Sequence, residues 1–321
     1  MKKGAYMEAI MDCEKFVEEQ ISQIKQTVGN AKAICALSGG VDSSLVTVLG
    51  HRALGRRFKA IFVDNALMRQ GEPQRVVKTF ANMGIPVELV NAQEEFLSAL
   101  AGLTDPEEKR QAVTDTFYAK VFSRLVKESD AKFLLHGTIL TDIEETIAGI
   151  KRQHNILAQL GIDPEEAYGY SVLEPLKTLR KDGVREVCEF LELPVEISRR
   201  IPFPGPALAA RIVGEVTRRR LTTVRAATAI VEEELRDSGA FQYMAVLLND
   251  RATGIRDNKR EFGQIIVVRC IESTDARTAT ATELPWDKLQ RICERIISEI
   301  EDVNRCLYDL TPKPPATVEY I

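Results

Sequence analysis

The residues best able to do chemistry form a short run of small side chains near the start of the chain. In order they are Ser38, Gly39, Gly40, Val41, Asp42, Ser43 and Ser44. An apolar segment, 31–37, precedes the run and is typical of a buried strand, and residues after Ser44 continue as a helix. Glycines let backbone N–H groups approach an anion, and the first turn of a helix favours negative charge. The run therefore predicts a phosphate-binding loop to which the serine hydroxyls add hydrogen bonds.

Spacing excludes two better-known nucleotide loops. The Walker pattern needs a lysine that reaches the terminal phosphates, and none follows Gly40. The dinucleotide fingerprint needs three spaced glycines, whereas only Gly39 and Gly40 are present. The remaining S-G-G-x-D-S-S pattern resembles the PP-loop of the N-type ATP pyrophosphatases. That resemblance implies cleavage of ATP between its α and β phosphates, with a substrate activated as its adenylate.

Composition narrows the class of protein. The 321 residues include 43 basic and 47 acidic side chains, a net charge of -4, so we expect no nucleic-acid partner. No apolar run is long enough for a membrane span and no leader opens the sequence, so we expect no membrane partner and a cytoplasmic protein. The six cysteines contain no C-x-x-C pair, which argues against a disulfide framework or a zinc site.

Strands and helices alternate over the first two hundred residues. Strand-like runs at 58–63, 86–90, 132–135 and 172–176 are separated by helical segments such as 73–83 and 105–129. This order predicts an α/β fold with a doubly wound, mostly parallel sheet. Ligands of such sheets bind outside the carboxyl ends of the strands, where the Ser38 loop falls.

A proline-rich stretch, 202–206, marks the expected boundary between domains 1–202 and 203–321. Beyond it we expect strands at 210–216, 243–248 and 265–271, helices at 218–237 and 286–300, and extended segments at 305–310 and 316–320. The second domain is therefore predicted to be a smaller α+β domain.

Four motifs in one order give the chain a specific resemblance. Residues 38–44, 203–206 (F-P-G-P), 211–217 (R-I-V-G-E-V-T) and 313–319 (K-P-P-A-T-V-E) are similar to stretches of GMP synthetases, over nearly the whole chain. The resemblance implies a PP-loop ATP-pyrophosphatase domain followed by a dimerisation domain that binds xanthosine monophosphate (XMP). The glutaminase domain of the fused enzyme is absent, so the chain resembles the separate synthetase subunit of the two-subunit form.

The family's reaction sets the expected chemistry. A GMP synthetase is a ligase that adenylylates XMP and lets ammonia displace AMP, which gives GMP. The resemblance therefore implies ATP as substrate, Mg²⁺ as cofactor, a homodimer, and a separate glutamine amidotransferase subunit that supplies ammonia.

The resemblance also assigns site residues. ATP is expected on residues 38–44, on Val63 at the end of a strand, and on Gly137 and Thr138. Magnesium is expected on Asp42, Asp142 and Glu145, and the catalytic residues are Asp42 and Lys151, which lies in a stretch similar to the family's lid. Two simpler readings stay open: Asp42 stabilises a helix dipole, and Asp142 and Glu145 belong to a solvated acidic loop.

The XMP site is expected on two distant stretches. The resemblance implies Arg110 on one, and Lys313, Thr317 and Glu319 on the other. Cations suit the acceptor's phosphate, whereas a carboxylate suits its N–H or hydroxyl groups. Alternatively, Arg110 lies on a solvated helix face and Lys313 in a rigid proline turn.

Departures from the family pattern leave two rival functions open. They include His136, Gln153, Ala207 and Pro312, and they gather on the lid and the acceptor side, whereas residues 38–44 are intact. One rival is a paralogous PP-loop enzyme that adenylylates another nucleotide or a tRNA base. The other is a nucleotide-binding regulatory subunit without turnover.

Overall fold

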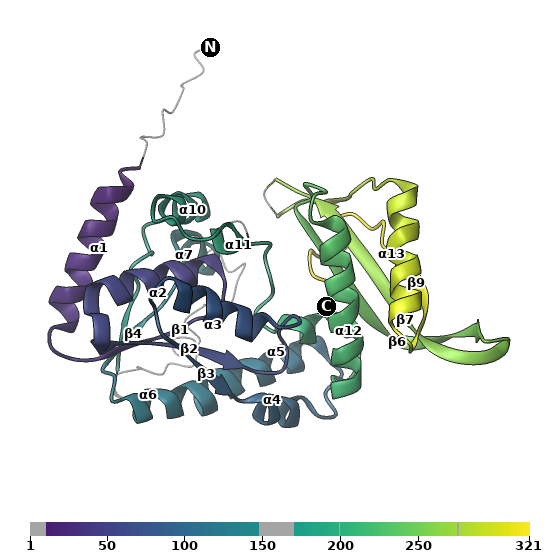
Figure 1. Cartoon of the computed structure of the whole chain (residues 1–321), viewed down its shortest axis with the longest axis horizontal. Coiled ribbons are helices and arrows are strands. Elements are labelled where there is room, and N and C mark those ends of the chain that lie inside the picture. The colour runs from purple at the N-terminus through teal and green to yellow at the C-terminus, as the bar shows by residue number, and fades with distance from the viewer. Residues whose placement is uncertain (1–10, 148–169, 199, 275) are drawn as a thin grey trace, which may run out of the picture. The chain divides into compact units, whose positions relative to one another are not determined.

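A five-stranded sheet in the order β3-β2-β1-β4-β5 organises the first part of the chain (Figure 1). Strand β1 pairs in parallel with both β2 and β4, and β4 pairs in parallel with β5. The strands are β1 (Ala33–Ala36), β2 (Phe58–Asp64), β3 (Val87–Asn91), β4 (Phe133–Leu135) and β5 (Ser171–Leu173). Most side chains of β1 and β2 are buried, as expected for strands covered on both faces. The predicted doubly wound α/β sheet is confirmed.

Helices lie on both faces of this sheet. Figure 1 shows α1, α2, α3 and α10 on one face and α6 on the other, and α2 contacts both α1 and α10. These helices are α1 (Cys13–Val28), α2 (Val41–Leu54), α3 (Glu72–Asn82), α6 (Ser123–Ser129) and α10 (Lys181–Phe190). The same part of the chain also contains η1 (Gly55–Arg57), which is a single turn, α7 (Leu140–Ile147) and α11 (Val195–Ser198). Helix α1 begins where the Asp12 side chain accepts a hydrogen bond from the Lys15 amide at 3.0 Å.

The computed structural model describes residues 11–147, 170–198, 200–274 and 276–321, with the side chains of 145–147 left aside. Its contacts divide the chain into two compact units built from alternating segments. The first unit is Met1–Val63, Val76–Leu89 and Phe122–Arg200, and the second is Asp64–Arg75, Val90–Val121 and Ile201–Ile321. The predicted domains 1–202 and 203–321 stay a prediction. No helix in the described ranges has the length and apolarity needed to cross a bilayer.

The second unit contains a smaller sheet with two covering helices. Strand β7 (Lys259–Glu272) pairs with β6 (Gln242–Arg256) and β8 (Thr280–Ala281) in antiparallel and with β9 (Val303–Tyr308) in parallel. Asp257 and Asn258 join β6 to β7 with φ of 49° and 59°, the geometry of a tight hairpin turn. Helix α12 (Arg218–Leu235) packs on β6, and α13 (Trp286–Glu299) packs on β9. Helices α4 (Gln93–Leu100) and α5 (Pro106–Asp115) also belong to this unit.

Three sequence-based expectations are wrong in detail. The predicted helix 105–129 is divided into α5, a π-helical stretch η2 (Thr116–Phe122) and α6. The predicted strand 210–216 is replaced by the 3₁₀ turn η3 (Ala207–Arg211) and one isolated bridge from Ile212 to Leu247. Residues 316–320 form no strand. In the last two cases a buried cation from elsewhere in the chain binds the backbone carbonyls, as described below.

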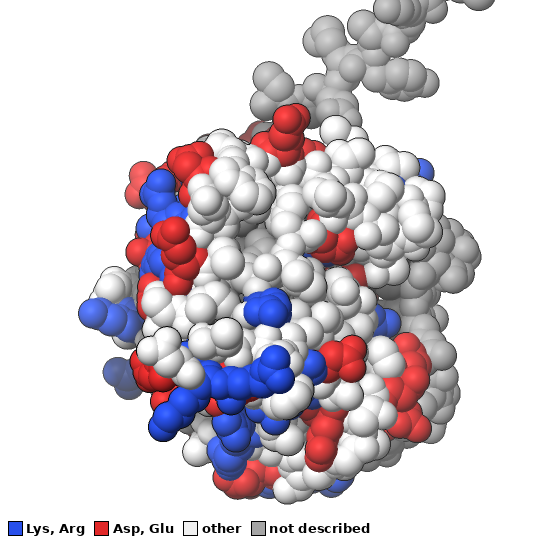
Figure 2. Space-filling model, turned by 90° about the vertical axis from the view of Figure 1, so that its right-hand side faces the viewer, with Lys and Arg blue, Asp and Glu red and all other residues white. Residues whose placement is uncertain are grey.

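Charge on the face shown in Figure 2 is mixed. Lys and Arg side chains gather on one part of it, with Asp and Glu side chains beside them. This face is therefore not uniformly basic.

Candidate functional site

Gly39 and Gly40 turn the chain between β1 and α2. The Leu37 amide donates to the Ile61 carbonyl at 2.8 Å and so extends the β1–β2 pairing up to the loop. Gly39 follows with φ of 75°, and Gly40 caps α2 without any side-chain hydrogen bond to the cap. The N–H groups of the first turn of α2 therefore have no side-chain cap, which leaves the helix N-terminus suited to an anion.

The loop's hydroxyls bond largely to one another. The Ser43 hydroxyl lies 2.9 Å from that of Ser38, accepts from the Ser38 amide at 3.1 Å, and donates to the Gly40 carbonyl at 3.1 Å. These contacts brace the loop. Ser44 is fully buried, and its hydroxyl has no hydrogen-bond partner among the described residues. Sequence reasoning assigned all three hydroxyls to phosphate and did not anticipate this bracing.

The loop after β4 lies against the start of α2. A Cβ placed on Gly137 would lie 3.2 Å from the Asp42 carbonyl carbon and the Ser43 nitrogen, so a larger residue would push the two backbones apart by a few tenths of an ångström. Thr138 is buried and donates to Glu174 at 2.6 Å, and the His136 ring nitrogen lies 2.8 Å from the same hydroxyl. Because strand order reverses at β1, the β1 and β4 loops meet at the position where ligands of open α/β sheets bind.

Asp42 is ion-paired to a residue that sequence reasoning missed. Lys181, at the start of α10, donates to Asp42 Oδ2 at 2.6 Å. The other carboxylate oxygen, Oδ1, is buried without a partner in the described part of the chain. Asp42 also lies in the first turn of α2, where a carboxylate stabilises the helix dipole whether or not it also binds a ligand. Lys181 stands 139 residues from Asp42 in sequence, and no local pattern links the two.

Arg200 completes the charged surroundings of the loop. Its Nη1 donates to the Gly39 carbonyl at 2.6 Å. The first unit therefore places two cations, Lys181 and Arg200, on a loop whose ligand is expected to be polyphosphate.

The donor set fits a Mg²⁺ ion held mainly by phosphates. No group of three or more His, Cys, Asp or Glu side chains able to hold a metal occurs among the described residues. Mg²⁺ is commonly bound through one or two carboxylates plus substrate phosphates, and the partnerless Asp42 Oδ1 offers one such ligand. Asp142 accepts a hydrogen bond from the Ile139 amide at 3.2 Å, at the start of α7.

The described part of the chain includes only some of the other residues predicted for this site. Val63 lies buried at the end of β2. Glu145 lies on α7, but its side chain is outside the described residues. Lys151 and Gln153 also lie outside the described residues.

In the second unit, Glu319 is held by a buried arginine. Arg211 has no exposed surface and binds both carboxylate oxygens, with Nε to Oε2 at 3.2 Å and Nη2 to Oε1 at 3.1 Å. Gln242 donates to Oε1 at 2.5 Å. The same guanidinium lies 4.8 Å from the ring centre of Phe203, and that of Arg69 lies 3.9 Å from it. The F-P-G-P motif is thus fixed by cation–π contacts in this unit.

Lys313 and Thr317 also bind the backbone. The Lys313 ammonium donates to the Ala276 carbonyl at 2.7 Å, and the Thr317 hydroxyl donates to the Glu319 carbonyl. Lys313 is half-buried and Thr317 is exposed. Lys313, Thr317 and Glu319 lie on one short segment of the sequence, and their side chains are held by different partners.

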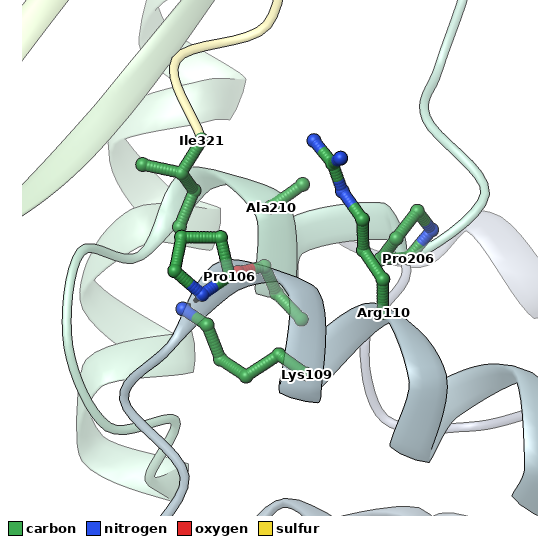
Figure 3. A pocket seen from close by; sticks show the side chains of 7 residues that line it. Pro106, Lys109, Arg110, Pro206, Ala210 and Ile321 are labelled. Atoms are coloured by element: carbon green, nitrogen blue, oxygen red, sulfur yellow. Dashed lines mark hydrogen bonds between the residues drawn. The ribbon is translucent and has the colours of Figure 1, made fainter.

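Arg110 lies on α5 beside a small hollow lined also by η3 residues and the terminal Ile321 (Figure 3). It is about half exposed and lies 3.6 Å from Glu107, so the solvated-face reading fits its present contacts. Its neighbour Lys109 extends in a different direction (Figure 3) and is 1% exposed.

Lys109 explains why 210–216 is not a strand. Its ammonium donates to the Ile212 carbonyl at 2.7 Å, the Gly214 carbonyl at 3.1 Å and the Ala209 carbonyl at 3.4 Å. Three carbonyls that converge on one nitrogen require a curled backbone. Burial, with a smaller effect of the nearby Arg220, lowers the pKa of Lys109 to about 8.

Comparison with known proteins identifies the family of the chain. The family model "GMP synthase C terminal domain" matches residues 229–320, and the model "NAD synthase" matches residues 10–125. The chain is 50% identical over 310 residues to a subunit of the glutamine-hydrolyzing GMP synthase of Archaeoglobus fulgidus, with 97% of this chain and 100% of that protein covered. The chain belongs to this family. The corresponding GMP synthase subunit of Pyrococcus horikoshii is 48% identical over 313 residues, with 97% and 100% covered.

Solved structures were compared with the chain as well. An NH3-dependent NAD synthetase from Campylobacter jejuni, in complex with the nitrate ion, matches 59% of this chain and 78% of its own, with a TM-score of 0.47 and 17% identity. Membership of the GMP synthase family makes this chain a member of a family of ligases.

Proposed function

We propose that this chain aminates XMP to GMP at the expense of ATP, through an adenylyl-XMP intermediate, with release of AMP and pyrophosphate. Relatives that are about 50% identical over their full length are named as subunits of a glutamine-hydrolyzing GMP synthase, which supports GMP synthesis as the reaction. The observation that carries the proposal is the loop between β1 and α2, where an uncapped helix N-terminus, a close approach of Gly137 and the Lys181–Asp42 pair coincide.

The chain's own groups would act on the leaving pyrophosphate. Backbone N–H groups at Gly39 and the first turn of α2 would bind and orient the β and γ phosphates, and the Gly40 N–H, which donates to the Ser38 hydroxyl at 3.3 Å, would exchange that contact for a phosphate oxygen. Lys181 offsets negative charge as the α–β bond breaks, because its three donors exceed the one hydrogen bond it makes to Asp42. Val63, Gly137 and Thr138 complete the proposed ATP site, and Lys151 would act as the lid lysine.

Mg²⁺ would be held by Asp42 Oδ1 together with the phosphates, with Asp142 and Glu145 as further proposed ligands. When bound, it neutralises charge on the polyphosphate. Asp42 is thus proposed to orient Lys181 with one oxygen and to ligate the metal with the other.

XMP would bind the second unit, through Arg110, Lys313, Thr317 and Glu319. Lys313 uses one of three donors on the Ala276 carbonyl, which leaves two for a phosphate. Glu319 would orient N–H or hydroxyl groups of the nucleotide, fixed in place by Arg211. In these terms residues 1–202 handle ATP and contribute Arg110 to the XMP site, and residues 203–321 supply the rest of that site and the dimerisation surface.

The proposal extends to partners. The relatives are named as subunits, which supports a separate partner, and we propose that this partner is a glutamine amidotransferase that delivers ammonia. We further propose a cytoplasmic homodimer that binds neither nucleic acid nor membranes.

The test is a reaction of the purified chain with ATP, Mg²⁺, ammonium and XMP. We expect equal amounts of GMP and pyrophosphate, and loss of both in Asp42→Ala and Lys151→Ala. The matched control is Asp182→Ala, which removes the carboxylate next to Lys181 in the sequence. The Asp182 side chain is 90% exposed. Pyrophosphate release that needs a different acceptor would instead identify a paralogue. Tight ATP binding without release would identify a regulatory protein.

A further inference from the structure

Arg269 lies on β7 with 1% of its surface exposed, and it is absent from the four motifs that mark the family. A buried arginine retains its charge, so its donors need partners. The hydrogen-bond partners described for its side chain lie on one stretch of chain, residues 309–318. This stretch carries the proposed XMP residues Lys313 and Thr317 and leads directly to Glu319.

The guanidinium joins the two ends of that stretch. Nη1 donates to Asp309 Oδ2 at 2.6 Å and to the Thr311 carbonyl at 2.9 Å, before the proline turn. Nη2 donates to the Thr317 carbonyl at 2.9 Å, and Nε lies 3.3 Å from the Val318 carbonyl, after the turn. One planar group therefore joins the residues before the proline turn to those after it, and Lys313 lies between them in the sequence. A lysine has only three donors on a single nitrogen, so it cannot reproduce these four contacts, which three nitrogens of one planar group make.

Other contacts complete the frame around Arg269. The Asp309 amide donates to the Val268 carbonyl at 3.0 Å, which ties the loop's entry to β7 itself. Lys313 and Ala279 exchange two backbone hydrogen bonds, at 2.8 and 3.0 Å. Burial raises the pKa of the Asp309 carboxyl, but hydrogen bonds from Thr311 and the charge of Arg269 outweigh it and hold that pKa below its ordinary value. Asp309 therefore stays ionised as the partner of Arg269 at neutral pH.

We propose that Arg269 is a positioning residue for the nucleotide acceptor, which sets the spacing of Lys313, Thr317 and Glu319 without touching the substrate. This inference rests on the proposed XMP site. It predicts that a change at Arg269 weakens the use of XMP and spares the use of ATP, because the ATP loop belongs to the first unit. A merely structural arginine would lower stability without such selectivity.

The experiment compares steady-state kinetics of the full chain with ammonium as nitrogen donor. For Arg269→Lys we expect KM for XMP to rise about tenfold or more, with KM for ATP changed by less than about twofold. Arg295→Lys is the matched control, since Arg295 also makes several hydrogen bonds in the second unit, to Glu233, Glu234 and Glu299, but none to residues 309–319. We expect both its KM values to stay at the wild-type level.

A second variant covers the case in which Arg269→Lys does not fold. Asp309→Asn keeps the side chain's shape and its acceptor for the Thr311 amide but removes the charge that orients Arg269. We expect a smaller rise of KM for XMP, about threefold, again without a change for ATP. A wild-type KM for XMP in a folded variant, or equal rises of the KM values for XMP and ATP, would refute the positioning role of Arg269 and leave the proposed function standing. Absence of GMP formation by the wild-type chain overturns both this inference and the proposed function.

Discussion

Replacing Gly39 with alanine tests whether the loop between β1 and α2 is held by its contact with Arg200. Gly39 has φ of 75°, which alanine adopts only under strain. A Cβ there would also come within 2.6 Å of Arg200 Nη1 and 3.0 Å of Val76 Cγ2. The arginine would have to move, and its hydrogen bond to the Gly39 carbonyl would be lost.

Gly84 provides a matched control in the same unit. It has the same φ of 75°, but a Cβ added to it meets nothing within 4 Å. Gly84→Ala therefore carries only the backbone strain, about 1 kcal/mol. Gly39→Ala adds the lost hydrogen bond from a charged donor, about 2 kcal/mol, for a total of about 3 kcal/mol.

Urea-induced unfolding measures both free energies, and pyrophosphate release measures the function of the loop. We expect Gly39→Ala to lower kcat/KM for ATP at least about tenfold, since roughly 1.4 kcal/mol of lost stabilisation has this effect, and Gly84→Ala to leave it unchanged. Equal destabilisation of the two variants, within about 0.5 kcal/mol, would show that Arg200 contributes nothing to the loop.

Three further outcomes are expected. Lys181→Met should lower kcat/KM for ATP about 10²-fold. The free energy of unfolding should fall by only about 1 kcal/mol, because the ion pair of Lys181 with Asp42 is partly exposed. A loss of stability without a loss of activity would contradict the proposed role of Lys181 in ATP cleavage. The pKa of Lys109 is about 8 in the folded chain and higher when unfolded, so the unfolded chain binds more protons between about pH 8 and 10.5 and stability rises with pH there; Lys109→Met should lack that part of the slope in pH-dependent unfolding. Glu319→Gln should cost about 3 kcal/mol, because buried Arg211 loses its only carboxylate among the described contacts; an unchanged melting curve would refute this.

Local sequence determined the centre of the fold. The apolar runs and the glycine and serine residues that follow β1 act over a few positions, so the strand, the turn and the helix start could all be placed in advance. The alternation of strands and helices likewise fixed the parallel sheet, because a crossover helix between parallel strands leaves few other topologies. The assignment of ligands to these residues stays a prediction.

Tertiary structure decided which charges surround those elements. Lys181 and Arg200 reach the Ser38 loop from 139 and 161 residues away, and no periodicity links such distant positions. The expected strand at 210–216 failed for the same reason, since its carbonyls bind Lys109, about a hundred residues earlier. Likewise, Arg269 binds the carbonyls of Thr317 and Val318, which lie in the segment 316–320 that was expected to be extended. A sequence pattern reports local backbone preference, whereas a buried cation takes whichever carbonyls the folded chain brings to it.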